Sequence, residues 1–148
     1  MKKSIALSAL LVLSLPFGQA SAAGVEDTYR ISGLDRFETS ANISFEGWET
    51  SEVAVIATGR DFPDALSATP LAYKYDAPLL LTDTKNLPGS VAEELVRLEV
   101  KEVILIGGAS VISADVVKQL NELGITNISR ISGKDRFETS VNIAKEVG

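Results

Sequence analysis

Short apolar runs alternate with amphipathic segments along this chain. Four runs rich in Val, Ile and Leu predict strands at residues 53–58, 78–82, 103–106 and 125–131. The first three runs are continuous, without the alternation of apolar and polar residues that marks a half-exposed strand. Such runs are typical of parallel strands that are covered on both faces. The pattern therefore predicts a parallel sheet buried between helices.

Helical patterns fill the intervals, at residues 35–45, 63–75, 90–98 and 114–123. In the third, Val91, Leu95 and Leu98 recur at helical spacing and give the segment one apolar face. Ser113 can cap the fourth helix, and Gly124 can end it. The order of elements predicts an α/β fold, a three-layer unit with a mainly parallel sheet.

One string of residues occurs twice. Residues 30–43 return as residues 130–143, and only Leu34 and Ala41 differ, becoming Lys134 and Val141. Repetition of this length indicates a modular array of small domains. We expect a first repeat at residues 24–129 and the start of a second, truncated repeat at residues 130–148. Because no Pro-, Gly- or Ser-rich linker separates them, the two are expected to touch.

The first 23 residues have the features of a secretory signal peptide. Lys2 and Lys3 precede an apolar stretch at residues 5–15, and small residues follow up to Ala23. The apolar stretch is shorter than the roughly 20 residues that a membrane-spanning helix needs. We therefore expect a secreted chain with residues 1–23 removed and no membrane span.

Charge and missing residue types exclude several functions. The net charge is −6, and removal of Lys2 and Lys3 leaves 12 basic residues against 20 acidic ones. A chain with this acidic charge is poorly suited to binding nucleic acid, because proteins bind the phosphate backbone through basic faces. The chain has no Cys and no His, which excludes disulfides, thiol nucleophiles, His general bases and zinc sites built on either residue. We expect a chain without catalytic residues, cofactors or metal.

Polar loops follow the predicted strands at residues 58–61, 82–85, 107–110 and 132–136. In open parallel sheets, ligands bind beyond the carboxyl ends of the strands. Basic side chains in these loops could form a rim that pairs with phosphate or carboxylate oxygens. The candidate binding residues in and beside the loops are Arg60, Asp61, Asp64, Thr82, Lys85, Ser110, Lys134 and Arg136.

Several of these features have a second interpretation. Asp61 and Asp64, like Asp35 and Asp135, could cap helices or recognise sugar hydroxyls. The pair at residues 107–108 could form a tight turn, approach an anion closely, or hold a small molecule or nucleotide, the last by fold analogy alone. Trp48 could stack on a sugar or cover the edge of the sheet.

Four ordered motifs carry a family resemblance, at residues 30–39, 57–67, 78–82 and 106–108. With them, the chain resembles the cell wall-binding repeat 2 family of secreted and autolysin-associated surface proteins of Gram-positive bacteria. The resemblance implies a Toprim-like fold, in arrays of three repeats around a pseudo-threefold axis. It also implies non-covalent attachment to anionic wall polymers of the teichoic-acid or surface-polysaccharide type.

The resemblance assigns motif residues as well. The family's Pro-Ile-Leu-Leu-Thr motif falls on Pro78, Leu79, Leu80, Leu81 and Thr82, with Leu79 in place of Ile, and its repeated basic residue falls on Arg36 and Arg136. Toprim enzymes hold magnesium with a Glu after the first strand and a later Asp-x-Asp. Residues 58–60 are Thr-Gly-Arg and the chain has no Asp-x-Asp. The resemblance thus implies a fold without that metal chemistry.

Two functions follow as expectations. The first is a non-catalytic cell-wall-binding module that anchors a secreted protein to anionic wall polymers. Its other expected partners are neighbouring repeats of the same type, which self-association could also supply. The alternative is the N-terminal targeting part of a wall amidase, or of its activator, with catalysis beyond residue 148. Both place the protein outside the cell, in association with the wall.

Overall fold

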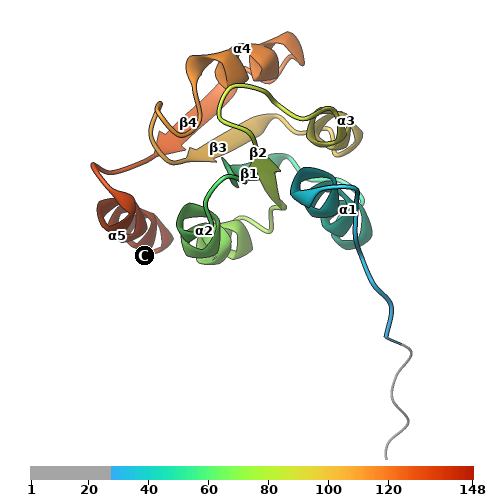
Figure 1. Ribbon diagram of the computed structural model, residues 1–148, viewed down its shortest axis with the longest axis horizontal. Helices are drawn as coiled ribbons and strands as arrows, with labels where there is room; N and C mark the ends of the chain where they lie inside the picture. The colour runs from blue at the N-terminus through green and yellow to red at the C-terminus, as the bar shows by residue number, and fades with distance from the viewer. Residues whose placement is uncertain (1–27) are drawn as a thin grey trace, which may run out of the picture.

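The computed structural model describes residues 28–148, and within them four strands lie between helices (Figure 1). The expected signal peptide at residues 1–23 lies outside the described residues. In chain order the elements are α1 (Arg36–Gly47), β1 (Val53–Thr58), α2 (Pro63–Lys74), β2 (Leu79–Thr82), α3 (Gly89–Arg97), β3 (Glu102–Ile106), α4 (Ala114–Glu122), β4 (Asn127–Ile131) and α5 (Arg136–Val147). No helix of this part of the chain is long and apolar enough to cross a membrane.

The sheet has the order β2-β1-β3-β4, and every pair of neighbouring strands is parallel. The predicted α/β class and parallel sheet are therefore confirmed. Strand β2 starts one residue later than expected, at Leu79, because Pro78 has no N–H to give to the ladder. The carbonyl of Pro78 still accepts a hydrogen bond from Val55 N at 3.0 Å.

Each face of the sheet has its own apolar core. Helices α3 and α4 cover one face, where Leu95 and Leu120 pack with the strand residue Ile56. Helices α2 and α5 cover the other, where Leu71 and Ile143 pack with strand residues of β1 and β3. The amphipathic pattern of the sequence therefore produces the three layers seen in Figure 1.

Helix α1 closes one edge of the sheet. It packs along β2 and α3, and the hydroxyl of Ser40 accepts a hydrogen bond from Leu81 N at 3.1 Å. The same hydroxyl donates to the carbonyl of Phe37. An edge strand with free N–H groups is open to pairing with other chains, so this helix protects β2.

The segment predicted to open a second repeat packs on the first. Strand β4 pairs with β3 along its whole length, and α5 lies against α2. Tyr75 donates to the carboxylate of Glu146 at 3.1 Å, and the ammonium of Lys74 donates to the Glu146 carbonyl. The residues that we expect to open a second repeat therefore lie directly against the preceding ones.

Candidate functional site

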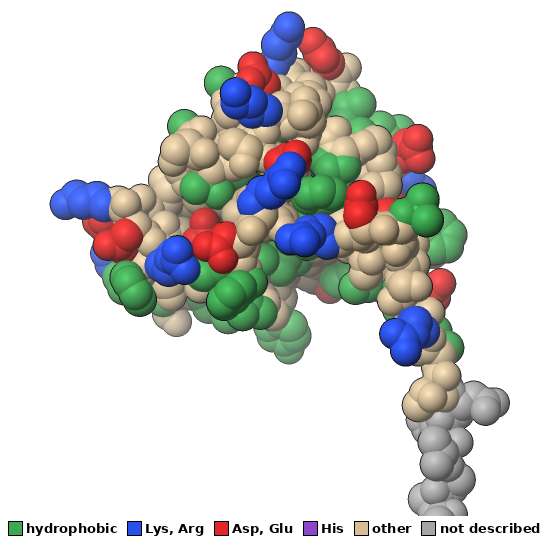
Figure 2. Space-filling model, viewed as in Figure 1, with side chains coloured by type: hydrophobic (Ala, Val, Ile, Leu, Met, Phe, Trp, Pro, Cys, Tyr) green, Lys and Arg blue, Asp and Glu red, His purple; other side chains and the backbone are tan. Residues whose placement is uncertain are grey.

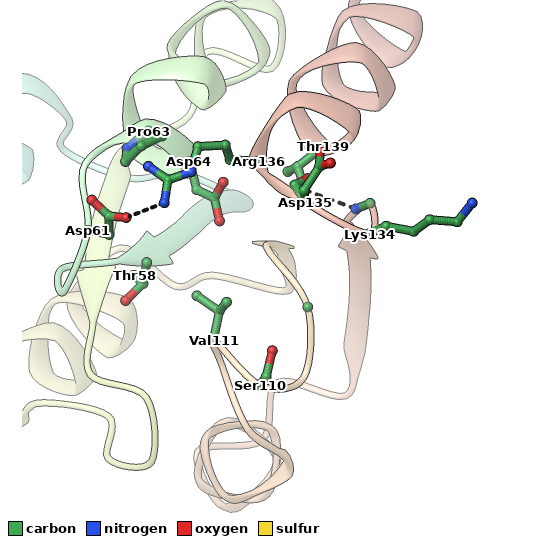
Figure 3. Close-up of a pocket in the computed structure, with 12 residues that line it drawn as sticks. Thr58, Asp61, Pro63, Asp64, Ser110, Val111, Lys134, Asp135, Arg136 and Thr139 are labelled. Carbon is green, nitrogen blue, oxygen red and sulfur yellow. Dashed lines mark hydrogen bonds and ion pairs between the residues drawn. The ribbon is translucent and has the colours of Figure 1, made fainter.

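Two hollows lie at the carboxyl ends of the strands, on either side of the loop at residues 59–61. The first, which we call the junction pocket, lies between the loops after β1 and β3 and the start of α5 (Figure 3). It brings together five predicted residues, Asp61, Asp64, Ser110, Lys134 and Arg136. The second, the loop pocket, is lined by Arg36, Arg60 and Asp61, with Phe62 and Leu81 beside them.

The repeated string forms a capped helix start that aims its basic residue at this site. Asp135 caps α5 by accepting from Glu138 N at 2.8 Å, and Glu138 reaches back to Lys134 N at 2.8 Å. Asp35 caps α1 in the same way. The capping interpretation is thus confirmed for Asp35 and Asp135. A Cβ on Gly133 would lie 2.5 Å from that of Glu138, so this reciprocal cap requires glycine there.

Equivalent arginines from the two copies hold the same loop. Arg36 Nη1 donates to the carbonyl of Gly59 at 2.6 Å, and Arg136 Nη2 lies 3.3 Å from Asp61 Oδ2. Figure 3 shows the guanidinium of Arg136 reaching across to Asp61 from the start of α5. The loop after β1 is therefore held from its own repeat and from the following one.

Arg60 is bound to the neighbouring strand end. Its Nε and Nη2 donate to the two carboxylate oxygens of Asp83 at 2.7 and 2.6 Å. These bonds, with a further one from Thr84 N, lower the pKa of Asp83 to about 2. Because Thr58 and Thr82 are partners in the β1–β2 register, the residues just beyond them meet. Sequence reasoning missed Asp83, although its place after a strand end was a usable signal.

Asp64 points into the junction pocket. Figure 3 shows its carboxylate beside Arg136, on the side of Val111. Burial raises the pKa of Asp64, the charge of Asp61 raises it further, and Arg136 acts in the opposite direction. Asp61 also accepts a hydrogen bond from Phe62 N at 3.0 Å. The pocket thus holds two neighbouring carboxylates that face one guanidinium.

The glycine pair after β3 forms a tight turn that receives β4. Gly107 has a φ of +108° and donates to the carbonyl of Ile131 at 2.9 Å. Arg130 lies on β4 and donates to the carbonyls of Gly107 at 2.6 Å and Ile112 at 3.0 Å, and burial lowers its pKa. A Cβ on Gly107 would lie 2.8 Å from Asp64 Oδ2. Arg130 was also missed, though its recurrence as Arg30 was a signal for a contact between repeats.

Some predicted residues lie away from the two hollows. Thr82 is fully buried, and its hydroxyl donates to the carbonyls of Asp83 at 3.2 Å and Asn86 at 3.3 Å. Lys85 is exposed but lines neither hollow. Thr82 is therefore positioned to support the loop rather than to meet a ligand.

The motif at residues 78–82 is mainly structural. Leu80 is fully buried in the core beneath α3 and α4, Leu79 packs against the core on the other face of the sheet, and Leu81 lines the loop pocket. Trp48 donates to the carbonyl of Asp76 at 2.9 Å and packs against the core that contains α3 and α4. Covering of the sheet is thus the role that this geometry gives to Trp48.

Comparison with known proteins decides the family. The sequence profile of the family described as Cell wall binding domain 2 (CWB2) matches residues 30–117. The chain belongs to this family. The resemblance on which the sequence analysis relied is therefore confirmed, and this CWB2 chain carries a wall-binding domain.

Three similar proteins define its context. The CWB2 chain is 34% identical over 148 residues to the N-acetylmuramoyl-L-alanine amidase LytC of Bacillus subtilis, and 34% identical over 147 residues to the amidase enhancer of the same organism. Cwp6 from Clostridium difficile is 39% identical, with a TM-score of 0.76 over 86% of this chain. The CWB2 chain spans 30%, 20% and 22% of these proteins, respectively.

Proposed function

We propose that this CWB2 chain is a non-catalytic module that holds a secreted protein on an anionic wall polymer. The observation that carries the proposal is the convergence of Arg36, Arg60 and Arg136, from separate elements, around the loop at residues 59–61. The planar guanidinium group suits the oxygens of phosphate and carboxylate groups. Side chains of this kind at the ends of parallel strands can hold successive anions along a polymer.

Acceptor groups in the same place suit the sugar units of such a polymer. Asp61, Asp64 and Ser110 line the junction pocket and can accept or share hydrogen bonds with hydroxyls. The chain as a whole is acidic, so attraction of a polyanion has to be local. At about 0.1 M salt, charges are screened over roughly 10 Å, which lets a small basic cluster act independently of the acidic surface.

The non-catalytic part of the proposal rests on the side chains that the sequence offers. The chain has no His, the residue most often used as a general base in hydrolysis, and no Cys, which would supply a thiol nucleophile. Of the two carboxylates that face the junction pocket, that of Asp61 is already paired with Arg136 and with the N–H of Phe62.

Contacts with neighbouring repeats form a second part of the proposal. Helix α1 buries Ser40, Ala41 and Ser44 against its own repeat, whereas α5 buries Thr139 and Ile143 against the preceding one. A helix with the repeated string therefore has two packing faces. On α5 the other face is exposed, with Phe137 and Val141 on the surface. The β2 and α3 of a complete second repeat would cover it, as those of the first repeat cover α1.

This arrangement favours a further repeat over a second copy of the chain as the occupant. The surface of β2 and α3 that would receive Val141 is already covered here by α1, and the surface of α2 is already covered by α5. A second copy would have to displace one of these helices. Self-association through these two surfaces therefore requires an exchange of segments, while completion of the second repeat requires none.

A second candidate function rests on the relatives. The similarity to an amidase and to an amidase enhancer favours a chain that targets such a protein, with catalysis in a part beyond residue 148. In that case the wall-binding role of the present residues is unchanged, and the cargo is an enzyme or its activator.

The test is binding of the exported chain to purified cell walls across a salt series, before and after acid extraction of the secondary polymers. We expect binding to intact walls that weakens with salt and disappears after extraction. Arg36→Ala and Arg136→Ala should weaken it. Lys118→Ala is the matched control, because Lys118 is an exposed residue of α4 that pairs with Glu122 at 3.7 Å. Equal binding to extracted and intact walls would contradict the proposal.

A further inference from the structure

We propose that Asp61 is an internal competitor for the anion that Arg136 binds, and that it lowers the affinity of the junction pocket for every anionic ligand by the same factor. The inference rests on the proposed function and adds an affinity-setting role for one residue of the same site. In this arrangement Asp61 occupies the guanidinium of Arg136 until a polymer replaces it.

The three arginines around the loop differ in how firmly they are held. Arg60 has two bonds to Asp83, at 2.7 and 2.6 Å, and Arg36 has one of 2.6 Å to a backbone carbonyl. Arg136 has one contact with Asp61 at 3.3 Å, longer than the 2.7–2.9 Å typical of charge-assisted hydrogen bonds. The Arg136 and Asp61 side chains are 55% and 51% exposed. Of the three arginines, Arg136 can therefore bind an external anion with the smallest loss of existing contacts.

The loop itself does not depend on the charge of Asp61. Asp61 Oδ1 accepts a hydrogen bond from Phe62 N, the next residue of the chain. The amide oxygen of an asparagine in place of Asp61 can accept the same bond. Asp64 lies beside Arg136 and interacts with its charge. When Asp61 leaves, Arg136 therefore keeps one carboxylate neighbour, and the contact between the two repeats retains a charged partner.

The affinity that is lost to this competition matters most for a ligand with a single contact. A single anion at Arg136 only substitutes for Asp61, so the number of charge pairs does not increase. A polymer can place a second anion at Lys134, which belongs to the same loop and extends away from the pocket in Figure 3. The second contact is intramolecular once the first has formed, so its effective concentration is high. Inorganic phosphate should accordingly bind weakly and a polyphosphodiester well.

The test compares Asp61→Asn with Glu122→Gln by calorimetric titration with inorganic phosphate and with a soluble teichoic acid. Both substitutions remove one negative charge, but Glu122 pairs with Lys118 on α4, away from the site. We expect Asp61→Asn to bind the polymer about two- to five-fold more tightly than the unaltered chain, the range of an exposed ion pair. Binding of phosphate should increase by a similar factor. Glu122→Gln should leave both affinities almost unchanged, and Arg136→Ala should abolish the gain from Asp61→Asn.

Each outcome decides the matter. If Asp61→Asn tightens binding no more than Glu122→Gln does, or keeps its gain in the Arg136→Ala background, the inference is wrong and the polymer site stands. If neither the unaltered chain nor Asp61→Asn binds the polymer, the proposed function fails and the inference fails with it. Asp61→Ser is the second variant, for use if Asp61→Asn lowers the melting temperature.

Discussion

Ile43 and Ile143 occupy the same position in two copies of one string, yet Ile43 is 49% exposed and Ile143 is 2% exposed. The difference arises from what lies outside each helix. Ile143 packs against α2 in the core shared with Leu71, whereas α1 turns its opposite face to β2 and α3. One sequence therefore serves two packing environments.

We expect Ile143→Ala to lower the free energy of unfolding by about 2–4 kcal/mol, because it leaves a cavity in a packed core. Ile43→Ala is the matched control, with the same chemical change in the same sequence context, and should cost less than about 1 kcal/mol. Urea unfolding of both variants measures the difference. Equal costs would contradict the packing described for α5.

Arg97 compensates a buried charge. Glu94 is 6% exposed and accepts two bonds of 2.7 Å from Arg97, which also donates to the carbonyls of Trp48 and Glu49. Arg97→Met should destabilise the fold by about 2 kcal/mol, because the Glu94 carboxylate is left without its partner. The double variant Glu94→Gln/Arg97→Met should recover much of this loss in urea unfolding. A double variant no more stable than Arg97→Met alone would show that the charge of Glu94 is not the cause.

Ser44 carries a buried hydroxyl oxygen without a hydrogen-bond partner in the described structure. Its counterpart in the second copy of the helix is Ala144. Ser44→Ala should therefore be neutral or stabilising by up to about 1 kcal/mol, since it removes an unsatisfied polar group and adds helix propensity. Thermal unfolding checks this. Ser40→Ala, which removes the acceptor for Leu81 N, should instead be destabilising.

Asp83 makes the stability of the fold depend on pH in the acidic range. Its pKa is held at about 2 in the folded chain by Arg60, below the ordinary value of 3.8. The folded state therefore binds this proton less readily than the unfolded state, and the contribution of Asp83 is present above about pH 4 and lost as the pH falls toward 2. Asp83→Asn should lower stability at neutral pH and flatten the loss across that window, as measured by unfolding at several pH values. Parallel pH curves for the two proteins would contradict this role.

The fold was largely predictable because local signals agreed with the global structure. The apolar run at residues 53–58 became β1 without change, and Ser113 and Gly124 delimit α4 as expected. The last strand is shorter than its apolar pattern, starting at Asn127, because only those residues reach the register of β3. Strand ends depend on the partner strand, which the local sequence does not specify.

The site was predictable in location but not in pairing. The loops after the strands did gather Asp61, Lys134 and Arg136 in one pocket. The partner of Arg60 is 23 residues away and depends on which strands are neighbours. Likewise, the repeated string could not reveal which face each helix buries, because the two helices share eight of their twelve residues and yet lie in different surroundings.

The last two residues of β4, Arg130 and Ile131, are the first two of the repeated string, and this has a consequence for how such genes change. Recombination between the two copies of the string would add or remove one unit of one hundred residues and leave the joint between strand and helix intact. The resulting chain would still supply each sheet with its fourth strand and each α2 with a covering helix. Arrays of different length can therefore arise in single genetic steps that keep four strands in every sheet.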